Sequence, residues 1–103
     1  MPTVKQIFEM MPAKFRPSAL SGEKSFYFSI GDNKYTVELG PDGCTVSKGK
    51  TRDNCDVVLK TTDKIFVNLV TKGKAPGPID IARGKFKTND VAGLTALKDL
   101  FDF

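Results

Sequence analysis

The residues that could carry out chemistry in this 103-residue chain are few and scattered. Histidine is absent, which removes the commonest general base and, with it, the Ser-His and Cys-His nucleophile pairs. Carboxylates are present, but they are spread along turns and polar stretches. We therefore expect that the protein is not an enzyme. A small enzyme with Cys44 or Cys55 as nucleophile is the weaker alternative, because the sequence supplies no obvious base for either thiol.

The same two cysteines limit metal and redox chemistry. Two thiolates without histidine cannot complete a four-ligand zinc site, so we expect no metal and no other cofactor. The first residues do not resemble a signal peptide, and no apolar run approaches the roughly 18 to 20 residues of a membrane-spanning helix. We therefore expect a cytoplasmic protein whose cysteines are reduced thiols rather than a disulfide.

Positive charge is concentrated in one stretch of a chain whose net charge is +4. Between residues 72 and 87, five cations face a single acidic residue, Asp80. The simple interpretation is a solvated basic face; the functional one is attraction to an anionic membrane surface or to phosphates on a ligand. Nucleic acid is not expected as a partner, because no aromatic RNA-binding motif, phosphate loop or recognition-helix pattern accompanies the charge. The five residues are Lys72, Lys74, Arg83, Lys85 and Lys87.

Hydrophobic periodicity places these residues on a regular framework. Alternating apolar residues predict strands at 25–30, 35–39, 44–47 and 56–60, and a short fifth strand at 85–88. Helices are predicted from the Thr3 cap to Pro12, from the Thr62 cap to Gly73, and from a cap at Asn89 or Asp90 to Phe101. A single helical turn is predicted to start at Pro78. This order predicts one α+β domain over residues 1–103, with helices covering a mostly antiparallel five-stranded sheet.

An ordered set of short motifs accompanies this framework. The chain opens with Thr-Val-Lys-Gln-Ile-Phe at 3–8 and Met-Pro-Ala-Lys-Phe at 11–15. Thr-Asp at 62–63 precedes Phe66, Leu69 and Val70, and Gly-Lys at 73–74 follows. Gly-Lys-Phe-Lys at 84–87 then leads into the closing amphipathic helix. Over nearly its whole length the chain thus resembles the sterol carrier protein type 2 family of nonspecific lipid-transfer domains.

The resemblance implies an apolar tunnel between sheet and helices that binds and transfers a lipid: a fatty acid, acyl-coenzyme A, phospholipid or sterol. It also makes the closing helix the expected gate. Each proposed wall residue can equally be plain core, so an accessory or protein-interaction domain with a self-filled core and no lipid is the alternative function. The wall residues that we expect to contact lipid are Phe66, Leu69, Ile79, Ile81, Phe86, Leu94, Leu97 and Phe101.

The chain departs from the family pattern at the apolar turn before the last strand. Residues 75–83 read Ala-Pro-Gly-Pro-Ile-Asp-Ile-Ala-Arg, with Asp80 and Arg83 introduced and the bulky Met and Phe positions of the family lost. Because the turn helps to line the tunnel in the family, we expect the ligand to differ from that of the sterol-named members.

Overall fold

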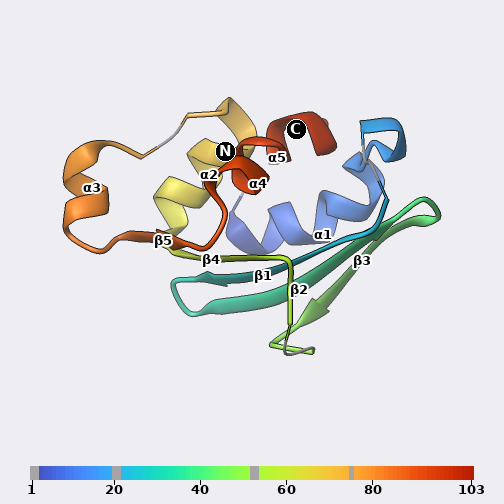
Figure 1. Cartoon of the computed structure of the whole chain (residues 1–103), viewed down its shortest axis with the longest axis horizontal. Helices are drawn as coiled ribbons and strands as arrows, with labels where there is room; N and C mark the ends of the chain where they lie inside the picture. Colours follow the sequence, from blue (N-terminus) through green and yellow to red (C-terminus); the bar gives the residue numbers. More distant parts are fainter. Residues whose placement is uncertain (1–2, 20–21, 52–53, 75) are drawn as a thin grey trace.

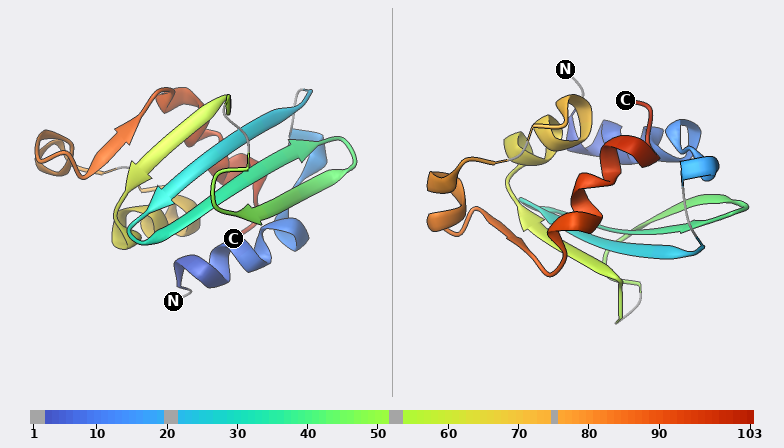
Figure 2. Two further views of the ribbon diagram at one scale, coloured as in Figure 1. Left: turned by 90° about the horizontal axis from the view of Figure 1, so that it is seen from below. Right: turned by 45° about the horizontal axis from the view of Figure 1, so that its top comes forward.

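A five-stranded sheet with helices on one of its faces forms the protein (Figure 1). The computed structural model describes residues 3–19, 22–51, 54–74 and 76–103. Strand order across the sheet is β3-β2-β1-β4-β5. Figure 2 shows the helices gathered on one side of the strands, with α3 standing out from one end of the body. The predicted α+β class is therefore confirmed.

Three consecutive strands form an antiparallel meander: β1 (Lys24–Ile30), β2 (Asn33–Gly40) and β3 (Gly43–Lys48). β4 (Val57–Thr61) then pairs with β1 in parallel, and β5 (Phe86–Thr88) pairs with β4 antiparallel. The sheet is therefore mixed. The central β1–β4 pair is parallel, and the other pairs are antiparallel, as the prediction of a mostly antiparallel sheet requires. The apolar sequence of β4 correctly predicted an interior strand, because β4 lies between β1 and β5.

Helix α1 (Val4–Lys14) begins at a capping box in which the Thr3 hydroxyl accepts from the Gln6 amide. The prediction that Pro12 ends this helix is wrong, since the helix continues through Pro12 to Lys14. A proline inside a helix removes one intrahelical hydrogen bond and crowds the carbonyl four residues earlier. The last turn of α1 gains a bond from outside the helix, since the Asp102 amide donates to the Lys14 carbonyl over 2.9 Å. A short 3-10 turn, η1 (Pro17–Ala19), follows.

Helix α2 (Asp63–Lys72) has the predicted ends: the Thr62 hydroxyl accepts from the Ile65 amide, and Gly73 closes the helix with a left-handed φ of 64°. The predicted turn at Pro78 is α3 (Pro78–Ala82).

The predicted closing helix is divided into α4 (Val91–Thr95) and α5 (Leu97–Leu100). Ala96 separates the two with a ψ of −17°, which tightens the turn, and the Asp90 carboxylate caps α4 by accepting from the Gly93 amide over 3.0 Å.

Aromatic side chains fill the space between α1, α2 and the sheet. The Phe8 ring stacks on Tyr35 at 4.1 Å and on Phe66 at 5.2 Å between ring centroids. Phe26 and Phe28 stack beside them at 5.6 Å. This cluster occupies the middle of the core, so space that a ligand could enter has to be sought nearer the β5 edge of the sheet.

Candidate functional site

An apolar pocket of about 390 Å³ lies where α2, α3, β5 and α4 meet. Each of these elements contributes an aliphatic or aromatic side chain to its wall, and the polar contributions come only from two consecutive residues of β5. The lining residues are Leu69, Pro76, Ile81, Phe86, Lys87, Thr88, Val91 and Leu94.

The pocket has a buried floor and an exposed rim. Leu69 is 6% exposed and Leu94 is 1% exposed, so both belong to the core. Ile81 is 52% exposed and Val91 is 64% exposed. Apolar side chains at such exposure are in contact with water, and covering them with an apolar ligand would be favourable at about 25 cal/mol per Å².

Hydrogen bonds to β4 fix the elements that frame the pocket. The Thr61 hydroxyl donates to the Lys85 carbonyl over 2.7 Å, which holds the start of β5. The Asn89 side chain accepts from the Val58 amide over 2.7 Å and donates to the Asp56 carbonyl over 3.3 Å. These bonds tie the junction between β5 and α4 to the neighbouring strand.

Gly93 seats α4 directly on the sheet. A Cβ at this position would lie 2.8 Å from Cγ2 of Val57 and 2.9 Å from the Asp90 carboxylate. Because such distances are too short for a carbon atom, only glycine lets the helix approach this closely. The close approach places the next residue, Leu94, in the floor of the pocket.

The structure divides the eight residues expected to contact lipid into three groups. Leu69, Ile81, Phe86 and Leu94 line the apolar pocket together. Ile79, on the exposed helix α3, is 67% exposed and is not part of the lining. The remaining three are fully buried in the core: Phe66, Leu97 and Phe101.

Sequence reasoning missed Pro76, Thr88 and Val91 as lining residues. For Val91 only a weak signal was present: this large apolar residue falls off the hydrophobic arc of the predicted closing helix. A single exposed apolar residue is common on protein surfaces, so the signal alone could not assign Val91 to a site.

The five predicted basic residues are all exposed, and they do not form one group. Lys87 borders the apolar pocket. Lys74 and Lys85 line a separate pocket of about 340 Å³, together with Lys64, which sequence reasoning did not single out. The other two, Lys72 and Arg83, line neither of these pockets.

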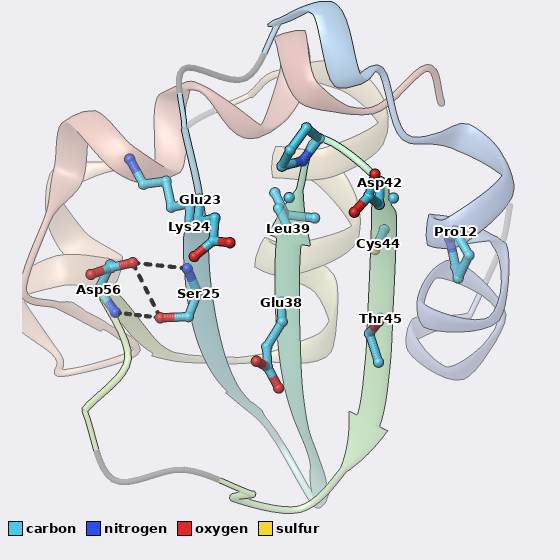
Figure 3. Close-up of a pocket in the computed structure, with 13 residues that line it drawn as sticks. Pro12, Glu23, Lys24, Ser25, Glu38, Leu39, Asp42, Cys44, Thr45 and Asp56 are labelled. Atoms are coloured by element: carbon cyan, nitrogen blue, oxygen red, sulfur yellow. Dashed lines mark hydrogen bonds between the residues drawn. The ribbon is translucent and has the colours of Figure 1, made fainter.

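A larger polar pocket of about 750 Å³ lies at the end of the meander where β1 and β3 begin and β2 ends (Figure 3). Three hydrogen bonds in its wall join Ser25 to Asp56, and this pair is here called the bracket. The Asp56 carboxylate accepts from the Ser25 amide at 2.9 Å and from its hydroxyl at 3.2 Å, while the Asp56 amide donates back to that hydroxyl at 2.9 Å. The bracket joins the start of β4 to the start of β1, so we assign these two residues a structural role.

The Cys44 thiol does not lie in a setting that favours nucleophilic chemistry. Cys44 and Cys55 are free and half-buried. Burial raises the pKa of the Cys44 thiol to about 11, which keeps it protonated at neutral pH, and the thiolate is the reactive form. Among the described residues, no three His, Cys, Asp or Glu side chains gather as metal ligands. No helix in that same part of the chain is long and apolar enough to cross a membrane.

The C-terminal residues are bound firmly to the end of α1. The Arg16 guanidinium contacts the Asp102 carboxylate at 2.7 Å, and the Arg16 amide donates to the Leu100 carbonyl over 2.7 Å. Phe15 and Phe101 form an isolated β-bridge. Of the predicted gate, α5 is thus anchored and contributes no residue to the apolar pocket's lining, whereas α4 supplies part of that lining.

No protein-family model matches the chain, and no curated protein matches it by sequence. Solved structures do match. The inverting sec-alkylsulfatase Pisa1 from Pseudomonas sp. contains a segment that superposes on 95% of this chain with a TM-score of 0.76 and 19% identity. The chain spans only 16% of that enzyme's length.

Other matches have nearly the size of this chain. The ubiquinone synthesis protein UbiJ-SCP2 superposes with a TM-score of 0.59 and 14% identity, covering 96% of this chain and 93% of its own. Apo sterol carrier protein 2 from Yarrowia lipolytica superposes with a TM-score of 0.53 and 24% identity, covering 90% and 84%. The chain therefore has the sterol carrier protein 2 fold, and the resemblance noted in the sequence is confirmed at that level.

Proposed function

We propose that this domain binds a lipid through its acyl chain, without catalysing a reaction, and can transfer it between surfaces. The observation that carries the proposal is the apolar pocket, whose rim residues Ile81 and Val91 are exposed to water above a floor formed by Leu69 and Leu94. Its volume of about 390 Å³ is in the range of about 300 to 1,000 Å³ that small-molecule sites occupy. Each methylene group that enters gains roughly 0.8 kcal/mol.

The gate of this pocket is proposed to be α3, which moves relative to an α4 that Gly93 seats on the sheet. Of the closing helix that the sequence predicted as a gate, only the α4 half borders the pocket, through Val91 and Leu94. Helix α3 has no buried residue, so few apolar contacts oppose its displacement. Moving α3 away from α4 would widen the mouth between Ile81 and Val91.

Contact with an anionic membrane surface is proposed to occur through α3. Ile79 leaves 67% of its surface exposed to water, and Arg83 follows at the end of the same helix. An exposed apolar residue beside cations is suited to the boundary between acyl chains and acidic headgroups. We expect the Ile79→Asn variant to associate less with phosphatidylserine vesicles, measured by co-sedimentation. Association unchanged by this substitution, by salt and by charge reversal at Arg83 would exclude this role.

The alternative is an accessory domain that packs against another protein domain. Two observations favour it: the exposed apolar surface of α3, and the close superposition on a segment of the alkylsulfatase, a much longer enzyme. The burial of Phe66, Leu97 and Phe101 fits the self-filled core that this alternative requires.

Native mass spectrometry after gentle purification separates the two functions. A co-purifying fatty acid or phospholipid, released when the protein is denatured, supports lipid binding. A protein that is free of lipid and does not bind added fluorescent fatty acids supports the accessory domain.

A further inference from the structure

The pocket of about 340 Å³ that contains Lys64, here called the lysine pocket, adjoins the apolar pocket. Pro76 lines both pockets. Two further pairs of consecutive residues are split between the pockets. Asp80 lines the lysine pocket and Ile81 the apolar pocket; Lys85 lines the lysine pocket and Phe86 the apolar pocket. The two cavities therefore lie on either side of the same short segments, and a bound molecule could occupy both by passing Pro76.

The chemistry of the two pockets is opposite. Three lysines line the lysine pocket, Lys64, Lys74 and Lys85, against one acidic residue, Asp80. All three lysines are exposed, so an anion can reach their charges. Among the described residues that line the apolar pocket, in contrast, Lys87 alone is charged.

The lysines come from separate elements that other contacts hold in place. Lys64 is in the first turn of α2, after the Thr62 cap. Lys74 follows the end of α2, and its amide donates to the Asn68 carbonyl over 3.2 Å. The Lys85 amide donates to the Asp80 carbonyl over 2.9 Å, and its carbonyl accepts from Thr61. The Lys64 and Lys74 backbones are thus fixed at the two ends of α2, and the Lys85 backbone is tied to β4 through Thr61.

We propose that the lysine pocket binds the anionic head, a phosphate or sulfate group, of the same amphiphile whose chain enters the apolar pocket. The ligand class is then a single-chain lipid with a compact anionic head. This inference rests on the proposed lipid binding in the apolar pocket, and it adds Lys64 as a headgroup ligand. Double-chained lipids are disfavoured, because the apolar pocket is a single cavity beside a single head site.

Three probes separate the contributions of the head and the chain: decyl phosphate, decanol and inorganic phosphate. Each is titrated calorimetrically below its micelle concentration into lipid-free protein at physiological salt. We expect decyl phosphate to bind at least tenfold more tightly than either of the others. In amide spectra it should shift signals of Asn68 and Lys85 together with those of Phe86 and Leu94, whereas decanol should shift only the second pair.

The Lys64→Gln, Lys85→Gln double variant tests the head site. Its matched control is Lys34→Gln, Lys48→Gln, which removes the same charge from β2 and β3 and touches neither pocket. Exposed ion pairs are each worth a few tenths to about 1 kcal/mol, so we expect the pocket variant to bind decyl phosphate about three- to tenfold more weakly and decanol unchanged. The control should retain the affinity of the parent protein.

The outcomes distinguish this inference from the function on which it rests. If neither decyl probe binds, lipid binding itself is wrong. If decanol and decyl phosphate bind equally, or the pocket variant and its control behave alike, the apolar pocket binds lipid but the head site is refuted. Inorganic phosphate that binds as tightly as decyl phosphate would indicate an independent phosphate site and would also overturn the inference.

Discussion

Replacing Gly93 by alanine tests how closely α4 packs on the sheet. Helix propensity predicts that the substitution raises the free energy of unfolding, whereas tertiary packing predicts that it lowers it. Alanine in place of glycine inside a helix ordinarily stabilises a protein by about 0.5 to 1 kcal/mol. Here the new Cβ would lie 2.8 Å from Cγ2 of Val57, which is fully buried and cannot move aside, and 2.9 Å from the capping Asp90 carboxylate. Overpacking of this kind costs about 1 to 3 kcal/mol.

We therefore expect Gly93→Ala to lower the free energy of unfolding by about 1 kcal/mol net, which corresponds to a Tm lower by about 4 to 8 °C. Urea and thermal unfolding followed by circular dichroism measure both quantities. The Val57→Ala background removes the contact with Val57 and leaves only the one with the Asp90 carboxylate, so the same substitution should cost less there. A stability gain in the parent protein, or an equal loss in both backgrounds, would refute the close approach of α4 to β4.

Three further predictions concern the core, the polar bracket and the thiol. Phe101→Ala should lower the free energy of unfolding by about 3 to 5 kcal/mol in denaturant titrations, because its ring is buried in the core. Unchanged stability together with lost lipid binding would instead indicate that the ring lines a lipid site. Asp56→Ala should cost about 1 to 3 kcal/mol, since it leaves the Ser25 amide without its acceptor, and Tm unchanged within error would contradict the bracket. In a Cys55→Ala background, the rate of Cys44 alkylation should keep rising from pH 9 towards pH 11, because burial raises the pKa of the Cys44 thiol to about 11 and the thiolate is the reactive form. A rate that levels off near pH 9 would show that the thiol is not desolvated.

Much of the framework could be predicted from local signals. The three strands of the meander, the Thr62 cap and the Gly73 stop each depend on neighbouring residues, and the structure has all of them. The end of α1 could not be predicted in this way. Whether a helix survives Pro12 depends on contacts with residues 100–102, nearly ninety positions away in the sequence.

The site was predicted only in part, for a related reason. Helical periodicity identifies which face of a segment is apolar, but it does not show how deeply that face is buried. Leu94 and Leu97 share one arc, yet Leu94 reaches the pocket floor and Leu97 lies in closed core. The lysine pocket was missed because Lys64 and Lys74 stand at opposite ends of α2, and Lys85 joins them only when the chain beyond α3 returns to the start of β5.

Two isoleucines on α3 provide the most direct test of lipid binding in the apolar pocket. Ile81 lines the pocket and Ile79 does not, although both are exposed residues of the same short helix. A ligand that covers the exposed half of Ile81 gains about 1 kcal/mol there. The measurement is titration of a fluorescent fatty acid into lipid-free protein: we predict binding to the parent protein, about fivefold weaker binding to Ile81→Asn, and unchanged binding to Ile79→Asn. No binding to the parent protein, or equal losses in the two variants, would contradict the proposed site.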